Sequence, residues 1–275
     1  MQPVGDKARQ EFLRLAQVDK WRFQAFFYLG LIYARKDRLA AALEWFDKID
    51  AGDLEFDARV NAVTALINLG RMTEARQRLN EVRHRFPHEA LRLYLLEAEL
   101  LSKIKDYDGA FELLSDALEE LPGQVELLYS RALVAGQLDR IEVVEADLRA
   151  VLEKNPDDHN ALNALGYTLV ERSDRLDEAK KYLDRAIELK PDDPAILDSY
   201  GWLQYRLGHH EVALKYLRRA YDLVRDVEIG AHLGEVLWES GHRQQAKKIW
   251  REAMRKDPDQ KDIQEIKVRY REAFK

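Results

Sequence analysis

A small or β-branched residue followed by a large apolar residue recurs at intervals of 33 to 35 residues along most of this chain. The large residue comes four positions after the small one, and a further apolar residue comes three positions later. Because spacings of four and three place side chains on one face of an α-helix, each interval predicts one amphipathic helix. The seven pairs are Ala42 and Phe46, Ala75 and Leu79, Ala110 and Leu114, Val144 and Leu148, Ala179 and Leu183, Ala213 and Leu217, and Ala246 and Trp250.

Prolines and glycines follow the same period. Prolines lie at 87, 122, 156, 191 and 258, so that the first intervals are 35, 34 and 35 residues and the last spans two periods. Upstream of the last three alanines, a second amphipathic segment carries Gly166, Gly201 or Gly234. A glycine inside a helix costs about 1 kcal/mol relative to alanine, so its presence indicates that a paired helix approaches closely. Each period therefore predicts a helical hairpin.

The pattern Leu-x-x-Leu-Gly, then Ala-x-x-x-large-x-x-Ala, then Pro, on a period of about 34 residues, resembles the tetratricopeptide repeat. The sharpest copies run over 162–191, 197–220 and 233–258. The resemblance implies an all-α fold, a right-handed α-α superhelical solenoid of helix hairpins with a C-terminal capping helix. It also implies that the first helix of each hairpin lines a concave groove.

The repeat boundaries follow from these markers. Residues 1–22 are expected to form the second helix of a repeat whose first helix is absent, which suggests a piece of a longer array. Residues 259–275 carry Ile263, Ile266 and Tyr270 on one side of a charged helix, and we expect this helix to cover the last hairpin. Between them, seven repeats are predicted at about 23–55, 56–90, 91–124, 125–158, 159–193, 194–226 and 227–258.

No motif in the sequence predicts catalysis, so we expect no enzyme activity, no cofactor and no metal site. The chain has no cysteine, no phosphate-binding glycine loop and no serine in a nucleophile elbow. His84 and His88 have helical ligand spacing, but Pro87 separates them and a third ligand is missing. The acidic stretches 155–158 and 190–193 lack the ligand order of a calcium loop, and we expect their aspartates to cap helices.

Charge and hydropathy restrict the partners. The formal net charge is −6, which argues against a general nucleic-acid binder because such proteins need a basic surface. No apolar stretch approaches the length of a membrane span, and residues 1–7 are polar.

Groove positions implied by the resemblance give the candidate binding residues. Four aromatic residues among them would form a run across three successive repeats, and aromatic anchors beside polar groups are typical of binding hot spots. The alternative is that Trp202 and Trp238 pack between repeats, since they lie close after Gly201 and Gly234. The candidate residues are Phe27, Leu31, Tyr129, Asn163, Tyr167, Asp198, Trp202, Tyr205, Arg206, Glu235 and Trp238.

We therefore expect a noncatalytic scaffold or adaptor that binds peptide or helix segments of other proteins in its groove, with no nucleic-acid partner. The last three repeats resemble those of bacterial tetratricopeptide proteins, among them an outer-membrane lipoprotein of Gram-negative bacteria that serves a periplasmic carboxyl-terminal processing protease as adaptor. This likeness implies a periplasmic location, a lipidated N-terminus outside this chain, and a role in bringing a protease to its substrates. Alternatives are a cytoplasmic assembly or chaperone-like module, a substrate-recognition array fused to an enzyme domain, and a purely structural oligomerisation role. The partner, the binding face, the oligomeric state and the content of any upstream repeats stay open.

Overall fold

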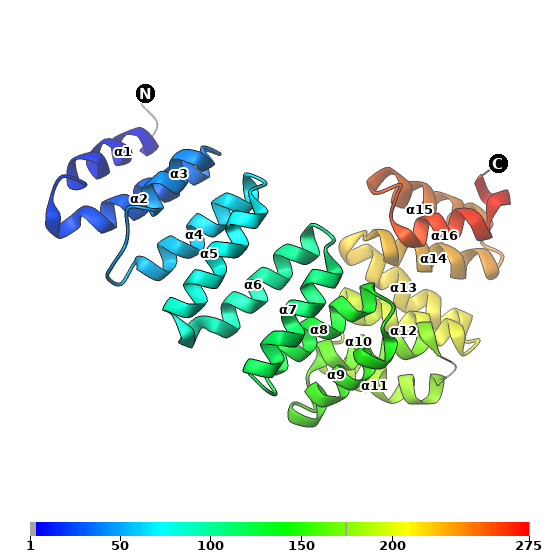
Figure 1. Cartoon of the computed structure of the whole chain (residues 1–275). Helices are drawn as coiled ribbons and strands as arrows, with labels where there is room; N and C mark the ends of the chain where they lie inside the picture. The colour runs from blue at the N-terminus through cyan, green and yellow to red at the C-terminus, as the bar shows by residue number, and fades with distance from the viewer. Residues whose placement is uncertain (1–3, 174, 275) are drawn as a thin grey trace. The chain divides into compact units, whose positions relative to one another are not determined.

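The computed structural model describes residues 4–173 and 175–274, and within these residues every regular element is a helix (Figure 1). The chain divides into two compact units, residues 1–122 and residues 123–275. The prediction of an all-α fold is confirmed. Residues 1–3, 174 and 275, which belong to predicted segments at the two ends and to one inter-helix turn, lie outside the described residues.

Within its described residues, the first unit contains seven α-helices, of which α1 is followed by three consecutive helix pairs, and two short 3₁₀ turns, Asp19–Trp21 and Pro87–Glu89. Its helices are α1 (Val4–Leu15), α2 (Arg22–Arg35), α3 (Leu39–Phe46), α4 (Glu55–Asn68), α5 (Met72–Arg85), α6 (Ala90–Lys103) and α7 (Tyr107–Glu120). The small and large residues of the period are buried at the helix interfaces, with Ala42, Ala75 and Ala110 almost wholly inaccessible. They form the core because each lies on the helix face turned toward its neighbour.

The described part of the second unit contains nine α-helices, and the last of them is followed by a 3₁₀ turn, Arg271–Phe274. Its helices are α8 (Val125–Gln137), α9 (Ile141–Lys154), α10 (His159–Arg172), α11 (Leu176–Leu189), α12 (Pro194–Arg206), α13 (His210–Val224), α14 (Val227–Glu239), α15 (Arg243–Lys256) and α16 (Lys261–Arg269). The segment after residue 259 packs on α14 and α15, where Ile263 and Ile266 are buried and the ring of Tyr270 lies 5.2 Å from that of Trp250. Among the described residues, none of the helices has the length and apolar character needed to cross a membrane.

Close helix pairing explains the mid-helix glycines. A β-carbon on Gly166 would lie 2.5 Å from Cγ of Leu183, and one on Gly201 would lie 2.8 Å from Cγ of Leu217. Real β-carbons essentially never approach other atoms so closely, so α11 and α13 can dock in this way only against glycine. The prediction that these glycines mark close approach of the paired helix is confirmed.

Aspartates cap the first helices of the last three hairpins. The side chain of Asp158 accepts hydrogen bonds from the backbone N–H groups at the start of α10, Asp193 does the same for α12, and Asp226 does so for α14. Capping satisfies backbone donors that have no partner inside the helix. The acidic stretches 155–158 and 190–193 therefore act as caps, as predicted, and the caps fix where each first helix begins.

Candidate functional site

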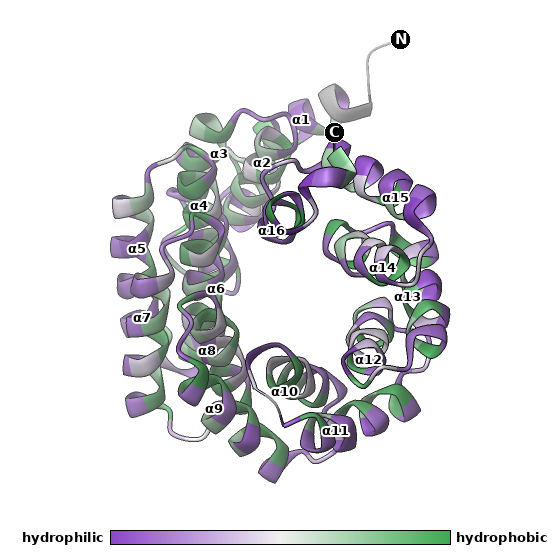
Figure 2. Cartoon of the chain, turned by 90° about the vertical axis from the view of Figure 1, so that its right-hand side faces the viewer, coloured by the Kyte–Doolittle hydropathy of each residue, from purple (hydrophilic) through white to green (hydrophobic). Residues whose placement is uncertain are grey.

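The first helices of the last three hairpins form one layer of the second unit. We call α10, α12 and α14 the first-helix layer; α10 contacts α12, and α12 contacts α14 (Figure 2). The helices α11, α13 and α15 form the other layer, and α16 lies beside α14. The predicted groove is the face of the first-helix layer that is turned away from α11, α13 and α15.

A cleft of about 480 Å³ crosses the first-helix layer near the beginnings of α12 and α14. Three of the predicted site residues, Asn163, Tyr167 and Asp198, line it together. We call it the acidic cleft because three of its lining residues carry carboxylates and none is lysine or arginine. The lining residues are Asn163, Ala164, Tyr167, Pro194, Ala195, Asp198, Ser199, Val224, Asp226, Glu228 and Ile229.

A buried histidine lies behind the acidic cleft. Nδ1 of His232 is 2.9 Å from Oδ2 of Asp198, and its ring stacks on that of Trp202 at 4.4 Å between centroids. Burial alone would lower the pKa of His232, but Asp198, by its charge and its hydrogen bond, and then the nearby carboxylate of Glu228 raise it to about 9. The imidazole is therefore charged at neutral pH and pairs with Asp198 in the interior.

Two further polar side chains hold the wall formed by α10 against α14. The hydroxyl of Tyr167 donates to Oε1 of Glu228 at 3.0 Å. Burial raises the pKa of Glu228, and the charge of His232 opposes that effect. Among the described residues, Oδ1 of Asn163 is buried without a hydrogen-bond partner. A buried acceptor without a partner is costly, so an N–H group of a bound molecule would stabilise this wall.

The tryptophans of the predicted aromatic run are mostly buried. Trp202 is 7% exposed and its Nε1 donates to Glu171, while Trp238 is 8% exposed with its ring 5.7 Å from that of Trp250. The indole rings of both tryptophans therefore pack within the chain, which is the alternative that the sequence left open. Their contact with a partner stays a prediction.

Tyr205, Arg206 and Glu235 occupy three different environments. The ring of Tyr205 keeps partial exposure 5.0 Å from that of Trp202, and burial raises its pKa to about 12. Arg206 is exposed, although one guanidinium nitrogen donates to the backbone oxygen of Val170 at 2.6 Å. Glu235 is buried and accepts from Nη1 of Arg269 at 2.6 Å. Tyr205 and Arg206 thus retain accessible surface, whereas Glu235 already has a cationic partner.

The remaining predicted residues lie on α2 and α8. Phe27 and Leu31 are partly buried on α2 of the first unit, where the ring of Phe27 lies 6.0 Å from that of Phe46. Tyr129 is partly buried on α8, and burial raises its pKa. None of the three lines the cleft, and their part in binding stays a prediction.

Sequence reasoning missed His232 and Glu228, although the period contains a signal for one of them. His232 follows Asp198 by 34 residues, the same separation as between Glu235 and Arg269. One period separates equivalent positions on α12 and α14, and on α14 and the capping helix α16, so an acidic and a basic residue at this separation predict an ion pair. Glu228 has no such signal, because its contact with Tyr167 spans 61 residues and skips one hairpin.

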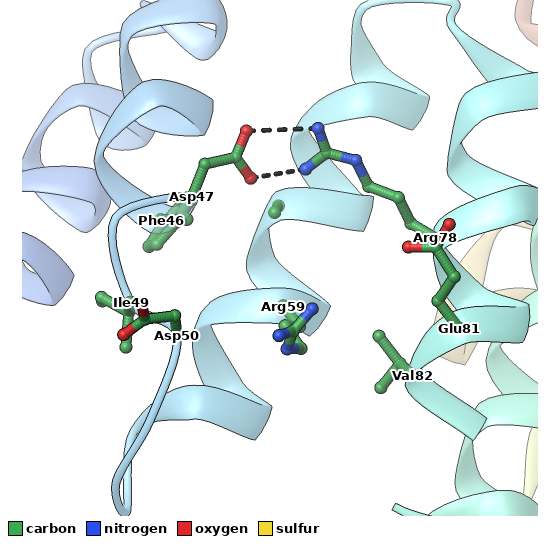
Figure 3. A pocket seen from close by; sticks show the side chains of 9 residues that line it. Phe46, Asp47, Ile49, Asp50, Arg59, Arg78, Glu81 and Val82 are labelled. Carbon is green, nitrogen blue, oxygen red and sulfur yellow. Dashed lines mark hydrogen bonds and ion pairs between the residues drawn. The ribbon is translucent and has the colours of Figure 1, made fainter. Parts of the chain in front are cut away.

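The first unit has a separate cleft of about 270 Å³, next to the end of α3 (Figure 3). It lies where α3 ends after eight residues, whereas α5 and α7 have 14. Figure 3 shows the carboxylate of Asp47 facing the guanidinium of Arg78, with Nη2 to Oδ2 at 3.2 Å. Arg59 in turn binds Glu55 at 3.0 Å. The arginines of this cleft are already paired with carboxylates of the chain. Its lining residues are Phe46, Asp47, Ile49, Asp50, Arg59, Ala62, Arg78, Glu81 and Val82.

Curated relatives match this chain over part of their own lengths. A tetratricopeptide repeat-containing protein of Pseudomonas aeruginosa is 40% identical over 211 residues, which cover 77% of this chain and 36% of that protein. A protein O-mannosyl-transferase of Drosophila melanogaster is 35% identical over 100 residues, which cover 34% of this chain and 11% of the transferase. The chain thus spans about a third or less of the length of these relatives.

Solved structures and family models agree on the fold. A tetratricopeptide repeat protein of Parabacteroides merdae matches with a TM-score of 0.68 and 18% identity, covering 89% of this chain and 96% of that one. A tetratricopeptide repeat protein of Thermus thermophilus matches with a TM-score of 0.57 and 23% identity, covering 66% of this chain and 98% of that one. Two models described as tetratricopeptide repeat match residues 5–54 and 60–125, and residues 157–226, and together they cover more than half of the chain. The chain therefore belongs to the tetratricopeptide repeat family.

Proposed function

We propose that this chain is an adaptor whose second unit holds a segment of a partner protein across the first-helix layer. Tetratricopeptide repeats imply a protein-interaction scaffold. The observation that supports this surface is the acidic cleft, which draws its lining from α10, α12 and α14 and from the end of α13. A site built from three successive hairpins suits an extended segment better than a compact small molecule.

For the partner, we propose an envelope protease of the carboxyl-terminal processing class, together with its protein substrates. The resemblance of the last three repeats to a bacterial adaptor lipoprotein supports this proposal. The same resemblance leads us to propose a periplasmic location with a tether to the outer membrane. Cell fractionation tests the location, and recovery of the natural protein in the cytosol would contradict it.

The partner is tested by affinity capture from separate envelope and cytosol extracts, read by mass spectrometry. The matched variants are Ala195→Trp, which fills the acidic cleft from an exposed position, and Val212→Trp, which adds the same ring on α13 outside the cleft. We expect wild type and Val212→Trp to capture a protease or its substrates from the envelope, and Ala195→Trp to lose them. Equal capture by both variants would place the binding surface elsewhere.

A second candidate is a recognition array attached to an enzyme domain. The similarity to part of a protein O-mannosyl-transferase of Drosophila melanogaster supports it. This candidate predicts that the natural polypeptide carries an enzyme domain in addition to the repeats. Immunoblotting for the size of the natural protein, followed by sequencing of the whole polypeptide, distinguishes it from the adaptor.

A further inference from the structure

We propose that the acidic cleft is an anchor pocket for a single lysine or arginine side chain of the partner segment. The inference rests on the proposed function, because it assigns a chemistry to the same surface. It concerns one side chain at one position, whereas the proposed function concerns capture of a whole protein.

The polar groups of the cleft are suited to accept hydrogen bonds from a cation. The carboxylate of Glu228 accepts a hydrogen bond from the hydroxyl of Tyr167, and that of Asp198 accepts one from Nδ1 of His232. An ionised carboxylate has about four acceptor positions, so one donor leaves each of them able to accept more. Oδ1 of Asn163, buried without a partner among the described residues, adds a neutral acceptor on the α10 side.

The charges around the cleft are unbalanced. Asp198 and Glu228 are two carboxylates against the single imidazolium of His232, and no lysine or arginine lines the cleft. Glu171, whose carboxylate accepts a hydrogen bond from Nε1 of Trp202, adds a further negative charge near the same histidine. Negative charge held away from water is costly unless it is paired, and a bound cation would provide the missing charge.

An apolar wall completes the match to a long basic side chain. Val224, which is 48% exposed, and Ile229 line the cleft together with Pro194 and Ala195. Lysine and arginine place three or four methylene groups before the charged head, and these stems pack on apolar surface. The stem would lie along Val224 and Ile229, and the head would reach Asp198 and Glu228.

The test uses four blocked pentapeptides of alanine whose central residue is arginine, lysine, citrulline or norleucine. Binding to the ¹⁵N-labelled full chain is followed by the side-chain amide signals of Asn163 and the backbone signals of Glu228 and Ile229. We expect the arginine and lysine peptides to bind at least about tenfold more tightly than the two uncharged ones. Equal affinity of charged and uncharged peptides, or shifts confined to other residues, would overturn the proposal.

Two variants and a control separate the charge from the fold. Glu228→Gln keeps an acceptor for the hydroxyl of Tyr167 and is expected to lower the affinity for the arginine peptide about tenfold. Val224→Lys places a cation at the exposed rim of the cleft. This cation is expected to compete with the arginine of the peptide and to weaken its binding to a similar extent. Glu211→Gln removes one exposed charge on α13 outside the cleft and should leave the affinity unchanged. If Glu211→Gln lowered the affinity for the arginine peptide as much as Glu228→Gln does, net charge alone would attract the peptide, and the anchor pocket would be refuted.

The two proposals can fail separately. If an envelope partner is captured through this face but the peptides show no preference for charge, the anchor pocket is wrong and the adaptor stands. If arginine binds the cleft with the expected dependence on Glu228 but no partner is captured, the pocket stands and the adaptor is wrong.

Discussion

The buried pair of His232 and Asp198 predicts a fall in the stability of the second unit at alkaline pH. The folded pKa of His232 is raised to about 9 from an ordinary value of 6.5. Because the folded state holds this proton more tightly, the stabilisation is complete below pH 6.5 and is lost as the pH rises through about 9. A rise of the pKa from 6.5 to about 9 corresponds to roughly 3 to 4 kcal/mol in the free energy of unfolding, at about 1.4 kcal/mol for each pH unit.

The measurement is urea unfolding of the full chain at pH 6 to 9.5, with the pKa of His232 followed independently by NMR of its ring. In Asp198→Asn, the main partner that raises the pKa is removed, so most of the fall between pH 6.5 and 9 should disappear. The matched control is His88→Gln, which changes an exposed histidine and should leave the fall unchanged. Titration of His232 at or below 6.5, or an unchanged fall in Asp198→Asn, would refute the reasoning.

Three further predictions concern packing and capping. Gly201→Ala places a β-carbon 2.8 Å from Cγ of Leu217 and should lower the free energy of unfolding by about 1 to 3 kcal/mol, measured with urea. In Gly136→Ala the nearest neighbour of the new β-carbon is 4.0 Å away, so this variant should be as stable as the wild type or more stable. If both alanines cost the same, close helix approach is not the reason for Gly201. Asp193→Ala removes the cap of α12 and should cost about 1 kcal/mol, seen as a lower Tm, and Asp193→Asn should recover most of it. Trp250→Ala empties a wholly buried site and should cost about 3 to 5 kcal/mol in the same unfolding assay, while an effect below 1 kcal/mol would show that the C-terminal aromatic cluster is dispensable.

The 34-residue separation links local sequence to contacts between hairpins. Asp198 meets His232 and Glu235 meets Arg269 at this separation, because equivalent positions on α12 and α14, and on α14 and the capping helix α16, lie side by side. In both pairs the acidic residue is buried and therefore needs a donor. The period thus specifies a salt bridge inside the first-helix layer and one between α14 and α16, as well as the apolar contacts between layers.

The sequence by itself determined the features that depend on short spacing along the chain. The four-and-three spacing around Ala179 and Leu183 predicted a helix face, Gly166 and Gly201 predicted close pairing, and the aspartates of 155–158 and 190–193 predicted caps. Each of these rests on the geometry of a single helix or hairpin, which local spacing fixes.

Only the tertiary structure decided which side chains of the first-helix layer remain accessible. Trp202 and Tyr205 lie three residues apart on α12, yet the first is buried and the second keeps partial exposure. Likewise, the acidic cleft depends on Glu228 of α14 approaching α10 across an intervening hairpin, and on Val224 at the end of α13. Exposure is set by how much volume the neighbouring hairpins supply around a residue, and that depends on side chains one and two periods away.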